Sequence, residues 1–386
     1  MTGVDTSTRK SVVTTRKSDS KTLTYALGAA GVVAGVAAVR GYHRMMLRNI
    51  NTGAPNQAAL DSLRGLGMLG PDGRIKLLRE RTPQALDGLE NLLANGRIKP
   101  GSEQLLSDKG VNGQLKSMLI ESRDGTQSVR AIERLPKAES LQEDFAWQVA
   151  RRLGIDYLFP GVAQRAGAPP GTMMIEMVPG KQLKKLGIEN SAQLEKVVHS
   201  FYAKNHPELG KAGIAKAARI DVQLLQSFDY ILANYDRHTA NAMADLATGQ
   251  AHFIDNGLVA AAEDPLNPLK PTLQHGLQAG LGKKGKVKLD PETVEVLRQR
   301  LTPDDLTSIH SRLDPAVDGV PALDRVFLGV ARSDFYRDNM VMRRNSLISN
   351  AGYSYDSNPH RQKASRFVRE LITGHKVPDQ RALPKA

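Results

Sequence analysis

Two short polar stretches hold the residues of this sequence that are best suited to chemistry: NYDRHTAN at 234–241 and HFIDNG at 252–257. Between them the sequence reads as a strand, a glycine-containing turn and a second strand, a hairpin that would bring Asn241 and Asp255 side by side at its open end. An amide oxygen and a carboxylate suit a divalent cation. Asp236 adds a second carboxylate that could receive a hydroxyl proton. This set predicts phosphoryl transfer, which needs a metal to neutralise phosphate charge and a group that orients the nucleophile.

The composition restricts the chemistry to hard ligands. The chain has 386 residues and no cysteine, so a thiolate nucleophile, a disulfide framework and cysteine-bound zinc are excluded. An oxygen-bound cation such as magnesium is therefore favoured. A chain of this length can bury a large core and form two lobes or domains.

The spacing of the polar residues resembles that of a known enzyme family. DRH at 236–238, Asn241 and IDNG at 254–257 follow the order of a kinase catalytic loop, its metal-binding Asn and its metal-binding Asp. The order Asp, Arg, His closely resembles the phosphatidylinositol 3- and 4-kinase superfamily and its atypical relatives, among them the HipA-type kinases and certain bacterial effector kinases. The resemblance covers roughly residues 105–300 and is sharpest over 230–257.

The resemblance implies a task for each side chain of the cluster, with ATP and Mg²⁺ as cofactors. Asp236 would act as the catalytic base or orient the nucleophile, and Asn241 and Asp255 would ligate magnesium. His238 would either contact the transferring phosphate or hydrogen-bond within the loop. Arg237 would pair with a carboxylate and fix the loop.

A strand-rich region upstream supplies the first of the elements that must position this site. Residues 115–122 and 127–135 read as two strands joined by the hairpin signal Asp124-Gly125. A helix with apolar residues at helical spacing follows over 139–153, with Ser140 as its candidate N-cap. The resemblance places Glu143 of this helix like the acid that pairs with the ATP-binding lysine of the family.

The resemblance also implies where the adenine would bind. The stretch MMIEMVPG looks like the strand and hinge that would meet it, through backbone groups of Glu176, Met177 and Val178. Upstream, Gly110 and Gly113 could let backbone N–H groups approach the phosphates.

The sequence departs from the family at the ATP-binding lysine. The relevant strand reads SVRAIERLPKA, and the candidates to replace the lysine are Arg130, Arg134 and Lys137. We favour Arg134, two residues before the proline, because a guanidinium can hold a phosphate. Its geometry differs from that of an ammonium group, so reduced activity, an unusual nucleotide pose and a pseudokinase all stay open.

Helical periodicity dominates from about residue 190, so the order of elements predicts an α+β class with a strand-rich part followed by a helical part. The resemblance implies that this is a bilobal protein-kinase-like fold. The small N-lobe would be β-rich and the larger C-lobe helical. The predicted divisions are a disordered, basic region at 1–50 with an apolar segment at 23–39, a helical extension at 51–104, the N-lobe at 105–180, the C-lobe at 181–340 and a basic tail at 341–386.

The net charge of +13 is concentrated at the two ends of the chain. Residues 1–50 carry eight Lys or Arg and two acidic residues, and residues 341–386 carry nine and three, which leaves about +1 between them. A nucleic-acid groove would place the excess on the folded domain, so nucleic acid is not favoured as a partner. Segment 23–39 is uncharged and just long enough to span a bilayer, so it is either a membrane-associating helix or an Ala/Gly-rich segment that a partner covers.

We predict an ATP- and magnesium-dependent phosphotransferase, an effector-like atypical kinase that acts on protein Ser/Thr. One alternative is a phosphoinositide kinase, because four lysines past Asp255 would suit an anionic headgroup, namely Lys283, Lys284, Lys286 and Lys288. The other is a pseudokinase that serves as a membrane-tethered binding module. A compact body behind a Ser/Thr-rich amino terminus resembles a secreted bacterial effector, which would act in a host cell and contact membranes through 23–39 and the basic tails. The bacterial membrane or cytoplasm is the alternative location.

Overall fold

The computed structural model describes residues 52–110, 113–136, 138–234, 237–257, 259, 286–313 and 333–354. The chain divides into two compact units, Met1–Tyr42 and His43–Ala386, and every described residue belongs to the second. The predictions for residues 1–50 and for the tail beyond residue 354 therefore lie outside the described residues. Within the described part, no helix is both long enough and apolar enough to cross a membrane.

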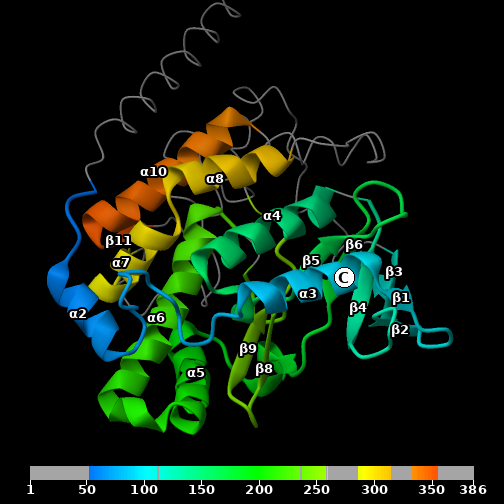
Figure 1. Cartoon of the computed structure of the whole chain (residues 1–386), viewed down its shortest axis with the longest axis horizontal. Coiled ribbons are helices and arrows are strands. Elements are labelled where there is room, and N and C mark those ends of the chain that lie inside the picture. Colours follow the sequence, from blue (N-terminus) through cyan, green and yellow to red (C-terminus); the bar gives the residue numbers. More distant parts are fainter. Residues whose placement is uncertain are drawn as a thin grey trace, which may run out of the picture. The chain divides into compact units, whose positions relative to one another are not determined.

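A six-stranded antiparallel sheet forms the strand-rich part of the second unit (Figure 1). Its order is β1-β3-β4-β6-β5, and β2 pairs with the same strand, β3, as β1 does. The predicted strands at 115–122 and 127–135 are confirmed as β3 and β4, joined by a turn with Gly125 at φ +70°. The bounds are β1 Arg97–Ile98, β2 Gln104–Gly110, β3 Gly113–Glu121, β4 Ser128–Arg134, β5 Val162–Gln164 and β6 Met173–Glu176.

Helices cover both faces of this sheet. α3, Pro83–Asn95, packs on one face, and α4, Ala138–Leu153, packs on the other. Because successive side chains of a strand point to opposite faces, Met174 joins the small core under α3 while Met173 and Ile175 join the main core with α4. The small core consists of Leu92, Leu93, Met118, Ile120, Ala131, Ala163 and Met174.

α4 confirms the predicted helix at 139–153 but not its predicted cap. The helix begins at Ala138, so Ser140 lies inside its first turn, where its hydroxyl donates to the Leu135 carbonyl at 2.8 Å. Ser140 is therefore no N-cap, since an N-cap side chain accepts from the helix backbone. Gly154, at φ +82°, ends the helix in a conformation that residues with a side chain rarely adopt.

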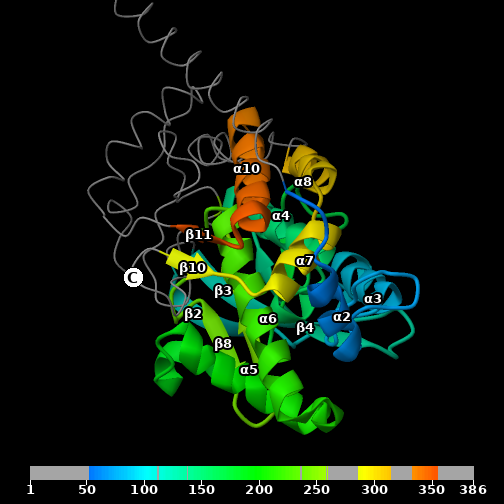
Figure 2. The ribbon, with the colours of Figure 1, turned by 90° about the vertical axis from the view of Figure 1, so that its left-hand side faces the viewer.

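The helical part is built around α6, Gly210–Ile231, which is buried on all sides along its second half. α10 lies above α6 in both Figure 1 and Figure 2 and holds its C-terminal end. The Tyr336 hydroxyl donates to the Leu232 carbonyl at 2.7 Å, and Arg343 Nε donates to the Ile231 carbonyl at 2.9 Å. The other helices are α2 Gln57–Gly65, α5 Ser191–Asn205, α7 Pro291–Arg300, α8 Pro303–His310 and α10 Asp334–Asn350.

The boundary predicted at residue 341 differs from the structure. Residues 341–350 continue α10, and Met342, Arg343 and Arg344 are buried there. The basic residues of this stretch misled the prediction because arginine is usually exposed, whereas these arginines donate to carbonyl groups at the ends of other helices.

A three-stranded sheet, β7-β8-β9, follows the six-stranded one along the chain. Residues 177–180, called the hinge segment below, connect β6 to β7. Gly180 has φ +113°, and a Cβ atom there would lie 2.6 Å from the Ala244 backbone, so a glycine is needed where the hinge segment passes β8. The remaining strands are β7 Lys181–Gln182, β8 Ala242–Asp245, β9 Gln250–Phe253, β10 Lys286–Lys288 and β11 Gly352–Ser354. Antiparallel sheets with a separate set of helices confirm the α+β class.

Candidate active site

The β8–β9 hairpin brings the two predicted metal-binding residues to its open end. Ala242 pairs with Phe253, and the Ile254 amide donates to the Asn241 carbonyl at 3.0 Å. Asn241 therefore lies across the hairpin from Ile254, and Ile254 is the residue that precedes Asp255 in the chain. The sequence-based expectation that the hairpin would bring Asn241 and Asp255 together is confirmed.

Asp255 has a left-handed backbone, with φ +56°. In a regular strand Asp255 would face away from its neighbour Ile254, and therefore also away from Asn241 across the ladder. The left-handed conformation interrupts that alternation just after β9 ends. Such a conformation is uncommon outside glycine, although Asp tolerates it better than most residues, and strained backbone of this kind is typical of functional sites.

Arg134, the predicted substitute for the lysine, lies at this open end. It is the last residue of β4, and its Nη2 donates to Asp255 Oδ1 at 3.1 Å. The Arg134 side chain is 17% exposed and that of Asp255 is 44% exposed. Solvent thus reaches the pair, and a ligand could displace either partner.

Glu143 completes this group from α4. It is buried, its Oε1 accepts from the Asn256 amide at 2.7 Å, and its Oε2 has no hydrogen-bond partner among the described residues. Burial raises the pKa of Glu143 to about 7, Arg134 opposes this rise, and the nearby charge of Asp255 adds to it. We name Arg134, Glu143 and Asp255 the Arg134 centre.

The loop before β8 is held by a second arginine. Tyr235 and Asp236 lie outside the described residues, so the structure does not place the predicted base Asp236. The next residue, Arg237, is fully buried and binds Asp229 of α6, with Nε 3.1 Å from Oδ2. The predicted carboxylate partner of Arg237 is thereby confirmed.

Arg237 also joins the loop to the segment that follows β9. It donates to the carbonyls of Asn241, at 3.4 Å, and Ile254, at 3.3 Å, and to the side chain of Asn256. Burial raises the pKa of Asp229, and the Arg237 guanidinium opposes that rise. We name Arg237 with Asp229 and Asn256 the Arg237 centre. It fixes the two predicted metal-binding positions relative to each other.

Sequence reasoning missed Asp229 and Asn256. Asp229 lies among apolar residues of α6, in the stretch QSFDYILA, and a charged residue on such a face needs a buried partner. That signal could have linked Asp229 to Arg237. Asn256 was visible only as part of the IDNG motif, and nothing in the sequence indicates that both its side chain and its amide are engaged.

His238 is bonded within its own loop. Its Nδ1 accepts from the Ala240 amide at 3.1 Å. A neutral imidazole that accepts at Nδ1 carries its proton on Nε2. The loop role is thus observed, and the phosphate role stays a prediction.

Hydrogen bonds at the end of β6 and in the hinge segment reduce the number of backbone amides that could donate to an adenine. The Glu176 amide donates to the Gly161 carbonyl at 2.8 Å, and the Met177 amide donates to the Arg130 carbonyl at 2.8 Å. Among the described residues, only the Val178 amide of these three has no hydrogen-bond partner. If the hinge donates to an adenine, Val178 is the residue of this set that can do so.

The oxygen atoms at the open end of the hairpin fit magnesium together with a phosphate ligand. Asp255 Oδ1 accepts from Arg134, and Oδ2 has no hydrogen bond within the described part of the chain. No three His, Cys, Asp or Glu side chains of the described residues gather into a metal site. A cation here would therefore rely on Asp255, on the Asn241 amide and on phosphate oxygens, which is how proteins commonly bind Mg²⁺ with a nucleotide.

Comparisons with known proteins concern the fold. No protein-family model and no curated protein matches the sequence. The structure is similar to the Helicobacter pylori proinflammatory kinase CtkA, at 14% identity and a TM-score of 0.36, over 70% of this chain and 96% of that one. It is also similar to the open conformation of CtTel1, at 13% identity and a TM-score of 0.28, over 82% of this chain and 14% of that one. The case for function rests on the site itself.

Proposed function

We propose that the protein is an ATP- and magnesium-dependent phosphotransferase with a bilobal kinase-like fold. The observation that carries the proposal is the Arg134 centre, where a basic residue of β4, a buried acid of α4 and the Asp of the IDNG motif meet. The three come from segments far apart in the sequence. A hairpin with a satisfied polar turn would need neither Arg134 nor Glu143 at this place.

The residues of the site have separate tasks in this proposal. Asp255 and Asn241 would hold Mg²⁺, which neutralises phosphate charge when bound. Arg134 would release Asp255 and bind nucleotide phosphates, since a guanidinium pairs well with phosphate oxygens. Arg237 keeps Asn241 and the segment around Asp255 in register through its bonds to both. Asp236 would orient the acceptor hydroxyl.

Protein Ser/Thr is the acceptor that we propose, with an effector-like role for the whole chain. The support is the general organisation of the sequence, a compact body behind a Ser/Thr-rich amino terminus. A phosphoinositide headgroup is the alternative acceptor.

One observation favours a second function, a silent kinase fold that binds nucleotide without transferring phosphate. Arg134 occupies Oδ1 of the predicted metal ligand Asp255. A guanidinium does not replace an ammonium group without change at a site that depends on geometry. If Arg134 stays on Asp255 when nucleotide binds, transfer would be weak or absent.

The destination of labelled phosphate tests these functions. The full chain is incubated with γ-labelled ATP, Mg²⁺, a cell lysate and mixed phosphoinositide vesicles. We expect label on protein Ser or Thr, reduced roughly a hundredfold or more in Asp255→Ala and unchanged in Asp304→Ala, an exposed aspartate of α8. Label in the lipid would favour the phosphoinositide alternative, and nucleotide binding without any transfer would overturn the enzyme proposal.

A further inference from the structure

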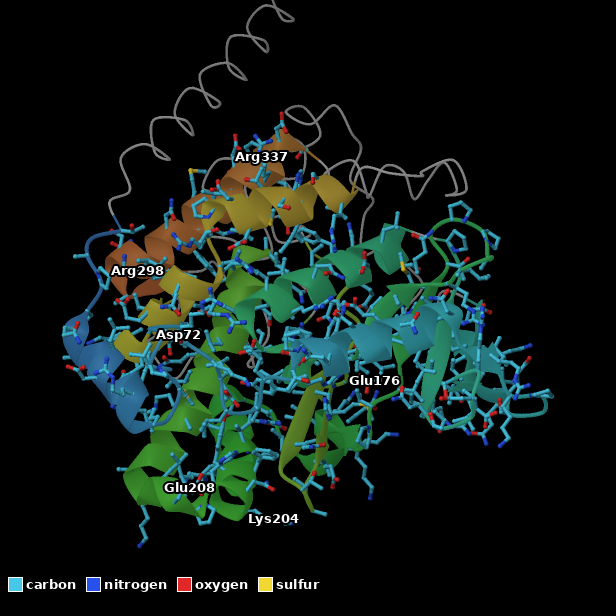
Figure 3. All side chains as sticks on the ribbon, in the orientation of Figure 1. Asp72, Glu176, Lys204, Glu208, Arg298 and Arg337 are labelled. Atoms are coloured by element: carbon cyan, nitrogen blue, oxygen red, sulfur yellow. The ribbon has the colours of Figure 1, made fainter. Side chains whose placement is uncertain are left out.

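A cavity of about 330 Å³ lies behind the hinge segment, apart from the Arg134 centre. Hinge residues form one wall, and the segment before α3, the chain after α4, α5 and β9 form the others. Its polar and aromatic lining is Arg79, Arg81, Tyr157, Glu176, Phe201, Gln250 and His252. Figure 3 labels Glu176, just below α3 in that view.

The strand register separates this cavity from the candidate active site. On the β4–β6 ladder, Arg134 pairs with Met173 and Ala131 pairs with Glu176. Partners across a ladder share a face, and residues three apart on one strand point to opposite faces. Glu176 and Arg134 therefore leave the sheet on opposite sides, and neither Asp255 nor Glu143 lines the cavity.

Arg79 presents unused hydrogen-bond donors to this cavity. Its side chain is only 4% exposed, and its guanidinium carbon lies 4.6 Å from the Tyr157 ring centre and 4.0 Å from that of Phe201. Nη1 donates to Asp221 at 3.3 Å. A guanidinium has five N–H groups, and among the described residues this is the only hydrogen bond that the Arg79 side chain makes. The aromatic rings hold the group in place while most of its donors stay open.

Glu176 supplies the negative charge in the lining, and Arg81 binds it. Arg81 Nη1 donates to Glu176 Oε2 at 3.2 Å, and the same oxygen accepts from the Gly161 amide at 2.9 Å. Arg81 Nε is 3.8 Å from Asp156, beyond hydrogen-bond distance. The carboxylate that lines the cavity is thus already engaged, whereas Arg81 keeps donors to spare.

His252 and Gln250 add two further unpartnered polar groups from β9. His252 is 6% exposed, and neither ring nitrogen has a hydrogen-bond partner within the described part of the chain. Burial, followed by the charges of Arg79 and Arg81, lowers the pKa of His252 to about 4, so its ring is neutral at pH 7; the nearby Tyr157 backbone acts in the opposite direction. The Gln250 side chain likewise makes no hydrogen bond to a described residue. Leaving a buried polar group such as the His252 ring unpaired is costly, which points to an absent ligand.

The hydrogen-bond inventory fixes the kind of ligand. The open donors are guanidinium and amide N–H groups with one imidazole N–H, and they outnumber the open acceptors, which are the Gln250 amide oxygen, the second His252 nitrogen and Glu176 Oε1; Glu176 Oε2 is taken. We propose that this cavity binds a small oxyanion, the carboxylate or phosphate group of a ligand that fits within it. The site stands independently of the phosphotransferase proposal, because it lies on the other face of the sheet and requires neither nucleotide nor metal.

The proposal is tested by calorimetric titration of the full chain at constant ionic strength. Inorganic phosphate and citrate are the two probes, used separately. Arg79 is unsuitable for the test, since its removal would leave Asp221 buried without its cation. His252→Leu and Gln250→Leu remove groups that bond to nothing described, so the fold should survive. We expect at least tenfold weaker binding in His252→Leu and a several-fold loss in Gln250→Leu.

Two matched variants identify the place of binding. Arg312→Gln alters a separate arginine-lined groove between α4 and α8 and should leave binding unchanged. Arg134→Met reports whether the probe binds at the candidate active site instead. Preference for phosphate or for citrate would name the source of the oxyanion. Absence of binding of both probes at millimolar concentration, or binding that Arg134→Met removes and His252→Leu keeps, would overturn the proposal.

Discussion

The Arg237 centre and the Arg134 centre both bind the segment 254–256 that follows β9, but their surroundings differ. Arg237 and Asp229 are both within 1% of complete burial, and Arg237 donates to four different residues. Arg134 and Asp255 reach solvent, and beside them Glu143 has a carboxylate oxygen that no described residue contacts through a hydrogen bond. The comparison indicates that Arg237, and not Arg134, has the structural role. A saturated buried pair can only hold the hairpin in place, whereas a partly exposed pair beside an unsatisfied acid can exchange partners when a ligand arrives.

The largest effect should follow loss of the buried arginine. Arg237→Met leaves Asp229 buried without its cation, which should lower the free energy of unfolding by about 3–5 kcal/mol. Urea denaturation measures the change, with the exposed Arg312→Met as control, expected within about 0.5 kcal/mol of the wild type. A loss below about 1 kcal/mol in Arg237→Met would remove the distinction between the two centres.

The unsatisfied acid of the Arg134 centre should make stability depend on pH. The pKa of Glu143 rises from 4.5 to about 7 on folding, so the folded state binds the proton more tightly. Stability from this group is present below pH 4.5 and is lost as the pH rises towards 7, because a buried carboxylate must then ionise. Glu143→Gln lacks this penalty, so its stability relative to wild type should improve by about 2 kcal/mol between pH 5 and pH 8.

Denaturation of both proteins at the two pH values measures this change. A constant difference between wild type and Glu143→Gln would show that Glu143 titrates normally. Glu143 would then lie in a polar environment, and its Oε2 atom would have no part in ligand exchange.

The exposed arginine should matter for ligand binding more than for folding. Arg134→Met should change the free energy of unfolding by less than about 1 kcal/mol, because partly exposed ion pairs contribute little. ATP affinity should fall roughly tenfold through loss of charge-assisted hydrogen bonds. Arg134→Lys should retain most of the affinity. Titration calorimetry checks both, and an unchanged affinity in Arg134→Met would contradict the role that we assign to the residue.

The smallest effect separates the two roles of His238. Asparagine can place an acceptor where Nδ1 accepts from Ala240, whereas glutamine can place a donor near Nε2. We expect His238→Asn to retain transfer activity within about threefold, as a loop role requires. If His238→Gln retains transfer activity and His238→Asn loses more of it, the side chain has the phosphate-binding role instead.

Much of this arrangement follows from local sequence patterns. The hairpin that joins Asn241 to Asp255, the strands β3 and β4 and the helix α4 were predictable from alternation, turn signals and helical periodicity. The pairing of Arg134 with Asp255 could be anticipated only through the resemblance to kinases, because 121 positions separate the two residues.

Features that depend on three-dimensional burial were not predictable. The sequence does not show that Arg343 and Arg344 are buried in α10, since an arginine becomes a core residue only when carbonyl groups at helix ends receive it. Nor does it show that the Met177 amide is engaged, because that depends on the β4–β6 register extending one residue past the strand. The cavity behind the hinge has the same origin, since its lining comes from five separate segments.

The dependence of ATP affinity on magnesium tests the central claim most directly. Titration calorimetry of the wild type and of Asp255→Ala is carried out with and without Mg²⁺. The Arg134 centre predicts that Mg²⁺ tightens ATP binding at least tenfold in the wild type, as Asp255 exchanges Arg134 for the metal, and has little effect in Asp255→Ala. Equal ATP affinity in the wild type with and without Mg²⁺, or an equal gain in the variant, would contradict the account.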